Sequence, residues 1–79
     1  MPHYAPPQKH SLTLHGHRTS VSLETEYWRL FRAIAEKEGK PFNVLAAEID
    51  EARAGQSGLA SAIRLYILDY LMTHRDFEV

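Results

Sequence analysis

Cysteine is absent from this sequence of 79 residues, which excludes disulfides and thiolate metal sites. Long apolar runs are also absent, and no stretch approaches the roughly 20 residues that a membrane-spanning helix needs. The first ten residues, MPHYAPPQKH, lack the apolar segment of a signal peptide. We therefore expect a cytoplasmic protein. Because so short a chain builds only a small core, we also expect oligomerisation to contribute stability.

The sequence motifs of catalysis are missing too. There is no glycine-rich phosphate loop, no paired-carboxylate motif and no nucleophile elbow. We predict that the protein is not an enzyme and has no cofactor and no small-molecule substrate. His15 and His17 would lie on one face of an extended segment, where His3 or His10 could complete a metal shell. Two histidines without a nearby carboxylate are a weak signal, so we predict no metal and interpret them as solvated polar residues.

Acidic residues are absent from the first 23 positions, although the chain as a whole has a formal net charge of -1. This segment contains Lys9, Arg18 and four histidines, and all ten acidic residues lie from Glu24 onward. A neutral-to-positive segment favours a polyanionic partner. The alternative is that a short segment lacks acids by chance.

The hydrophobic period changes from two to about three and a half at Leu23, which predicts a short strand over residues 18–23 followed by a helix. Residues 11–14 also alternate, but the apolar positions change parity after Gly16, and we expect a bend or bulge there. We find no second strand to pair with the first. An unpaired strand has exposed backbone hydrogen-bonding groups, so we expect it to pair with another copy of the chain.

Three helices are predicted: residues 24–38, from residue 42 or 43 to 53, and from residue 57 or 59 to 72. The first has an apolar stripe with Trp28 at its flank, and Gly39 is suited to end it. The third is apolar around most of its circumference and is expected to pack against a partner chain. Alternatively it covers the core of its own subunit. We divide the chain into a flexible arm (1–10), a core (11–53) and a C-terminal helix with a tail (54–79).

The order of strand, helix, turn and helix resembles the ribbon-helix-helix family of bacterial DNA-binding proteins. It is most similar to a small subgroup with the run Arg-Thr-Ser-Val-Ser-Leu-Glu and an additional C-terminal helix. The matching residues are Val21, Leu23, Glu24, Thr25, Glu26, Tyr27, Phe31, Ile34, Ala35, Gly39, Phe42 and Ile49, and in the later helix Leu59 to Arg64. The resemblance implies a mainly α-helical, intertwined homodimer whose two strands form an antiparallel ribbon.

In such a family the ribbon enters the major groove of double-stranded DNA, usually in a transcriptional regulator. Parity then assigns the base contacts to Arg18, Ser20 and Ser22. Family resemblance and position suggest phosphate contacts by Lys9, His17, Lys40 and Asn43. The dimer core is predicted to contain Val21, Leu23, Tyr27, Phe31, Ile34, Ile49 and Ile63. The other hypothesis is a dimeric protein-interaction module that uses the last helix, with Tyr66 and Tyr70; pairing of dimers into tetramers is also open.

Overall fold

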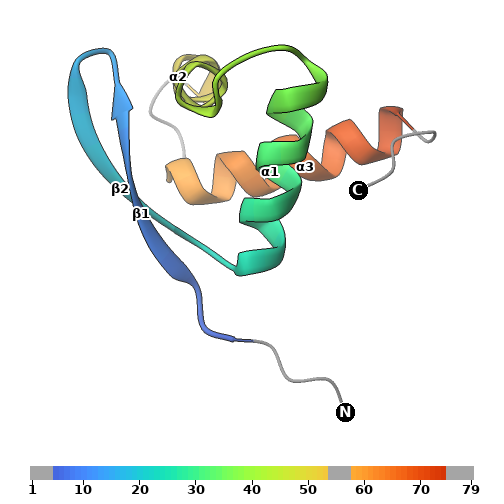
Figure 1. Cartoon of the computed structure of the whole chain (residues 1–79), viewed down its shortest axis with the longest axis horizontal. Coiled ribbons are helices and arrows are strands. Elements are labelled where there is room, and N and C mark those ends of the chain that lie inside the picture. Colours follow the sequence, from blue (N-terminus) through green and yellow to red (C-terminus); the bar gives the residue numbers. More distant parts are fainter. Residues whose placement is uncertain (1–4, 54–57, 75–79) are drawn as a thin grey trace.

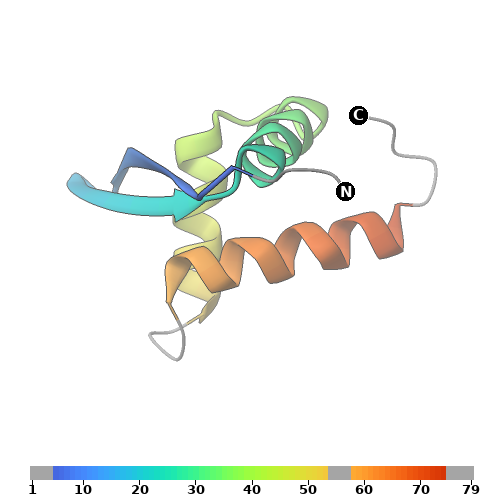
Figure 2. The same cartoon turned by 90° about the horizontal axis from the view of Figure 1, so that it is seen from below.

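A computed structural model describes residues 5–53 and 58–74. A two-stranded hairpin, β1 (Gln8–Leu14) and β2 (His17–Leu23), is followed by helices α1 (Thr25–Lys37), α2 (Phe42–Arg53) and α3 (Leu59–Thr73). In Figure 1 the hairpin lies to one side of the helices. Figure 2 shows α3 running along one side of α1 and α2, so that the three helices and one face of the hairpin surround a common interior.

The hairpin is the main departure from the sequence prediction. β2 does not lack a partner, because β1 pairs with it antiparallel in the same chain, from Gln8 opposite Leu23 to Leu14 opposite His17. His15 and Gly16 form the whole connection, with positive φ values of 53° and 81°. Positive φ at both central residues is the type I′ turn, whose twist matches that of the flanking strands. The predicted bend at Gly16 is therefore a complete reversal, and residues 8–10 belong to β1 rather than to the arm.

The change of parity at Gly16 has a simple explanation in this register. Even-numbered residues of β1 lie opposite odd-numbered residues of β2, as with Leu12 and Thr19. Directly opposed residues of a sheet point to the same face. Leu12, Leu14, Val21 and Leu23 therefore all face the helices, and each is at most 4% exposed. The pattern that we interpreted as a bulged strand is the pattern of a hairpin.

The three helices occupy nearly the predicted ranges. Helix α1 ends in a Schellman motif, in which Lys40 N–H donates to the Ala35 carbonyl and Gly39 N–H donates to the Glu36 carbonyl. Gly39 has a φ of 69°, which glycine adopts without strain. The predicted core residues that are buried in this single chain are Val21, Leu23, Phe31, Ile34, Ile49 and Ile63.

Two aromatic residues of α1 exchange their predicted positions. Trp28, which we placed at the flank of the apolar stripe, is only 4% exposed, whereas Tyr27 is half-buried. The reason is β1, which the sequence analysis did not recognise as a strand. The Trp28 indole N–H donates to the Gln8 carbonyl at 2.9 Å, and the His10 ring lies 4.4 Å from the indole. The first strand therefore covers the side of α1 that we expected to be open.

Helix α3 covers the core of its own subunit, which is one of the two alternatives that we considered for it. Leu59, Ile63, Ile67 and Tyr70 are buried against the rest of the chain. Its other side carries three large apolar side chains that are more than half exposed, Leu65, Leu68 and Met72. Among the described residues, no helix is both long enough and apolar enough to cross a membrane.

Candidate nucleic-acid interface

The outer face of the hairpin carries only polar and basic side chains. Arg18, Ser20 and Ser22 of β2 are exposed there, as their parity predicts. The structure adds three further exposed residues from β1, namely Lys9 opposite Ser22, Ser11 opposite Ser20 and Thr13 opposite Arg18. We define these six as the outer face. It contains two positive charges and no acidic or large apolar residue.

The alternation of the strands explains why this face is so uniform. Every second residue of each strand is apolar or faces the core, and the residues between them point away from the helices. Sequence analysis found the β2 half of the face and missed Ser11 and Thr13. The alternation of Ser11 and Thr13 with Leu12 and Leu14 is visible in the sequence. It predicts an outward position for Ser11 and Thr13 only when residues 8–14 are interpreted as a strand.

The two edges of the hairpin have different surroundings. In a two-residue turn the flanking residues form a hydrogen-bonded pair, and such pairs alternate along an antiparallel ladder. The backbone groups of Lys9, Ser11 and Thr13 therefore point outward from β1. On this edge Thr13 N–H donates to Oδ1 of Asn43 at 3.3 Å. On the β2 edge, within the described part of the chain, the outward backbone groups of Arg18, Ser20 and Ser22 have no hydrogen-bond partner.

The start of α2 lies beside the β1 edge. The Pro41 carbonyl accepts hydrogen bonds from the N–H groups of Val44 and Leu45, at 3.0 and 3.1 Å, so Pro41 stands at the N-cap. The backbone N–H groups of Phe42 and Asn43 in the first turn have no partner among the described residues. Free N–H groups at a helix N-terminus favour an anion. Asn43 uses its side-chain oxygen to hold β1, which leaves its Nδ2 atom as a donor.

Lys40 precedes α2 but is paired with an acid. Its Nζ atom donates to Oε1 of Glu48 at 2.8 Å, and this hydrogen bond raises the pKa of Lys40. Both side chains are about half exposed, so the pair is accessible to solvent. Lys40 is close to the start of α2, as the sequence suggested, but its charge is partly balanced by a carboxylate.

The two histidines at the tip of the hairpin are not arranged as we expected. His15 adopts a left-handed conformation in the turn, so His15 and His17 do not lie on one face of an extended segment. The His15 Nε2 atom lies 3.4 Å from Oε1 of Glu51 on α2. His17 is the first residue of β2, opposite Leu14, and is exposed. His15 therefore connects the turn with α2.

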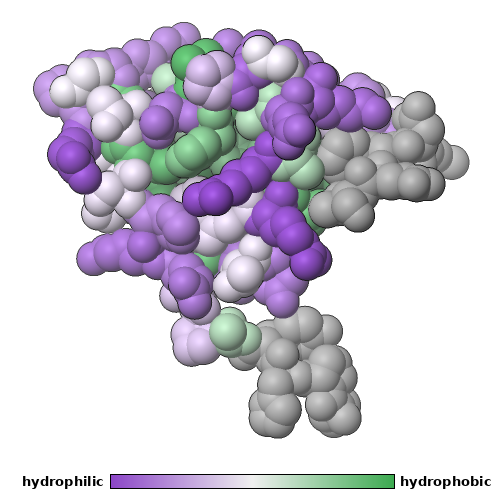
Figure 3. Space-filling view, viewed as in Figure 1, coloured by the Kyte–Doolittle hydropathy of each residue, from purple (hydrophilic) through white to green (hydrophobic). Residues whose placement is uncertain are grey.

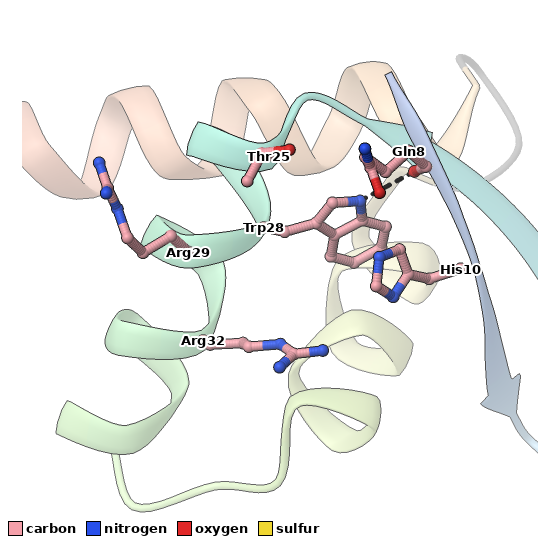
Figure 4. Close-up of a pocket in the computed structure, with 6 residues that line it drawn as sticks. All are labelled: Gln8, His10, Thr25, Trp28, Arg29 and Arg32. Carbon is pink, nitrogen blue, oxygen red and sulfur yellow. Dashed lines mark hydrogen bonds between the residues drawn. The ribbon is translucent and has the colours of Figure 1, made fainter. Parts of the chain in front are cut away.

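A hollow of about 290 Å³ lies between the start of β1 and α1 (Figure 4). Its lining consists of Gln8, His10, Thr25, Trp28, Arg29 and Arg32. The four α1 residues have the spacing i, i+3, i+4 and i+7, which places them on one helix face. The sequence analysis missed this basic face because it considered α1 only for its apolar stripe.

Comparison with known proteins agrees with this architecture. A family profile described as "Ribbon-helix-helix domain" matches residues 7–71. A solved structure, that of an uncharacterized protein from Bordetella pertussis Tohama I, is similar at a TM-score of 0.74 and 28% sequence identity. The match covers 89% of this chain and 59% of that protein, so the present chain spans little more than half of its neighbour. No curated protein matched the sequence.

Proposed function

The chain belongs to the ribbon-helix-helix family, and on this basis we propose that it is a DNA-binding protein that regulates transcription. The observation that carries the proposal is the outer face, with six exposed side chains that are all polar or basic. A face with two positive charges and no acidic residue suits the phosphate-lined groove of DNA. Figure 3 shows that hydrophilic side chains also predominate on the side of the molecule seen in Figure 1.

We propose that the protein binds as a homodimer formed along the β2 edge. The outward backbone groups of Arg18, Ser20 and Ser22 offer three donors and three acceptors, which an antiparallel β2 strand of a second copy would satisfy. Because a strand edge is identical in both copies, the pairing is compatible with a two-fold axis. The dimer would then contain a four-stranded sheet, with β2 of each copy at the centre.

The width of the major groove suggests different contacts for the two strands, with bases for β2 and with phosphates for β1. The major groove is about 12 Å wide and strands lie about 4.8 Å apart, so two central strands fit into the groove and the outer strands lie near its walls. Base contacts are thus assigned to Arg18, Ser20 and Ser22, with Arg18 suited to bidentate pairing with guanine. Lys9 lies on the outer strand, where a phosphate contact is expected.

Further phosphate contacts are assigned to the start of α2 and to the hairpin tip. The N–H groups of Phe42 and Asn43 and the Asn43 side-chain amide lie beside the β1 edge. His17 is exposed at the tip, and Lys40 can contribute if its hydrogen bond to Glu48 is exchanged for a phosphate. Since the net charge is -1 per chain, non-specific affinity should be weak and should fall steeply with salt. A bacterial, cytoplasmic setting is part of this proposal.

Selection of bound duplexes from a random DNA pool tests the proposal. Wild-type protein should enrich a two-fold symmetric site at a stated salt concentration. A variant with Arg18, Ser20 and Ser22 all replaced by alanine should enrich nothing, while keeping its thermal unfolding and its oligomeric state. Lys37→Ala removes a positive charge from the exposed end of α1 and should retain selection. Equal enrichment by wild type and the triple variant would refute the assignment of β2 to base reading.

The exposed side of α3 supports a second function, protein interaction, which is compatible with the first. Leu65, Leu68 and Met72 are exposed on α3, and the first two line a groove of about 470 Å³ between α1 and α3, to which Tyr27, Leu30 and Leu71 also contribute. Exposed apolar side chains at a spacing of three and four residues suit a second helix. We propose that two dimers pair here through α3 to form a tetramer.

Substitution of Leu65 and Leu68 by glutamate tests the second function. Sedimentation should then show dimers only. Each dimer should still bind one two-fold symmetric DNA site. Thr73→Glu adds a charge to the exposed surface of the same helix, away from the line of Leu65, Leu68 and Met72, and serves as the control. If the double variant sediments like wild type, α3 does not mediate association of copies.

A further inference from the structure

The hollow between β1 and α1 is built from groups whose positions are fixed by other contacts. The Trp28 indole is buried and donates to the Gln8 carbonyl, and the His10 ring lies against it with an interplanar angle of 43°. The Arg32 guanidinium lies over the Phe42 ring, 5.4 Å from its centroid. Figure 4 shows Arg32 extending across the hollow below Trp28 and His10, while Arg29 extends away from them on the open side.

The charge in this hollow is uncompensated. None of its six lining residues is acidic, and two of them are arginines. Across the described ranges 5–53 and 58–74, neither Arg29 nor Arg32 forms an ion pair with a carboxylate. By contrast, Arg64 on α3 pairs with Glu24, and Arg53 pairs with Asp50. The arginines of the hollow are thus available to an anion from solution.

We propose that this hollow binds a phosphate dianion, either inorganic phosphate or a small phosphate monoester. Arg32 extends into the hollow, Arg29 stands at its open side and no acid lines it, which favours a charge near -2. A monoester carries that charge at neutral pH and a DNA phosphodiester does not. Arg32 presents a planar fork that can donate two parallel hydrogen bonds to phosphate oxygens. Thr25 and the ring nitrogen of His10 supply further hydrogen-bonding groups at the wall.

The position of the hollow separates it from the DNA-binding face. Gln8 and His10 alternate with Lys9 along β1, so they point to the helix side of the sheet and not to the outer face. An anion seated between Arg32 and His10 would connect α1 with β1. Its binding free energy would therefore stabilise the packing of the hairpin on the helices. This proposal does not depend on DNA binding.

Trp28 offers a direct test, because it is the sole tryptophan of the chain and lines the hollow. Its fluorescence should change saturably when inorganic phosphate or glycerol phosphate is added at constant ionic strength, with chloride as the reference anion. Thermal unfolding should shift to higher temperature over the same concentration range. Arg32→Gln should weaken binding at least about tenfold, because it removes the charge and the fork. The phosphate affinity of Arg32→Lys should lie between the affinities of wild type and Arg32→Gln.

The control is Lys37→Gln, which removes a positive charge from the same helix outside the hollow and should bind phosphate like wild type. A parallel titration with a short duplex of arbitrary sequence distinguishes the two sources of phosphate. If the duplex changes Trp28 fluorescence in an Arg32-dependent way and free phosphate does not, the hollow holds a DNA phosphate and the proposal is wrong. Equal responses of wild type and Arg32→Gln to phosphate would also overturn it. Neither result would bear on base reading by Arg18.

Discussion

The two edges of the hairpin have the same geometry but different surroundings. On β1, Asn43 of α2 accepts the outward N–H of Thr13. On β2, the outward backbone groups of Arg18, Ser20 and Ser22 have no partner within the described residues. The strands are equally long, with seven residues each, and have the same order of buried and exposed positions. The difference therefore arises from where α2 packs.

This difference indicates which edge is suited to a second copy. A helix that covers part of one edge protects it from pairing, which is a common way to blunt edge strands. An uncovered edge of regular strand offers a template for another strand. In the proposed dimer β2 is central and β1 is outermost, so substitutions at the two edges should affect association of the copies differently.

Proline at the centre of each edge should give opposite results. Ser20→Pro removes an outward N–H from β2 without removing a hydrogen bond of the hairpin, because that N–H points away from β1. We expect the dissociation constant of the dimer to rise at least about tenfold, because a hydrogen bond between the two β2 strands is lost and the proline ring obstructs the neighbouring strand. Sedimentation equilibrium measures this effect.

Ser11→Pro is the matched control for that experiment, because Ser11 lies opposite Ser20 on the outward face of β1. It places the same ring on the edge beside α2 and should leave the dimer intact. If Ser11→Pro dissociates the dimer and Ser20→Pro does not, the two edges have been assigned the wrong way round.

Gly16→Ala should destabilise the hairpin by about 1–2 kcal/mol, because an L-residue with a side chain is strained in the left-handed region that this turn requires. Gly16→Asn should lose less stability than Gly16→Ala, because asparagine tolerates the left-handed conformation. Chemical denaturation gives the free energies of unfolding. Gly39→Ala should cost a similar amount at the end of α1 without weakening DNA binding of the folded protein. A neutral effect of Gly16→Ala would contradict the type I′ turn.

Asn43→Ala should cost about 1 kcal/mol, because it leaves Thr13 N–H without its side-chain acceptor on the β1 edge. Hydrogen exchange at Thr13 should accelerate more than exchange at His10, whose N–H lies within the hairpin ladder. Asn43→Asp keeps an acceptor and should protect Thr13 like wild type. Unchanged exchange at Thr13 in the alanine variant would show that the contact with α2 does not cover this edge.

The smallest expected effect concerns the end of β2, where Glu24 accepts hydrogen bonds from Arg64 of α3, the shorter at 2.8 Å. This hydrogen bond lowers the pKa of Glu24 below its ordinary value of 4.5. Because the folded-state pKa is the lower one, the contribution to stability is present above pH 4.5 and is lost as the pH falls through the folded pKa.

Glu24→Gln should therefore flatten the acid limb of the stability curve slightly and leave the β2 edge unchanged. Melting temperatures measured from pH 7 down to about pH 3 give this slope. Glu26→Gln, at an exposed position of the first turn of α1, is the control. A steeper acid limb in Glu24→Gln would mean that Arg64 does not favour the ionised carboxylate.

Several features of the fold could be predicted from local patterns. The range of α1, the glycine at its end and the start of α2 after Pro41 are properties of contiguous residues, and all three are close to the prediction. Arg18, Ser20 and Ser22 face outward because strand parity requires it. The prediction that β2 has no partner strand in its own chain was wrong, because the His15-Gly16 turn was interpreted as a bulge. A His-Gly pair is a weaker turn signal than Asn-Gly or Asp-Gly.

The hollow beside Trp28 shows why part of a candidate site escapes sequence analysis. Gln8 and Arg32 are 24 positions apart in the sequence, and neither belongs to a motif. They become neighbours only when β1 pairs with β2 and so passes beside α1. A prediction that gave residues 8–10 to a flexible arm could not place His10 against Trp28.

Local patterns were enough to predict the helices and the outward side chains of β2, because hydrophobic period and strand parity act over a few neighbouring residues. Only the packed chain shows that β1 returns along β2, that α2 meets one edge of the hairpin and that two arginines of α1 line a hollow without an acid. These are relations between segments far apart in the chain, and their energies depend on packing and hydrogen bonds that no local pattern encodes.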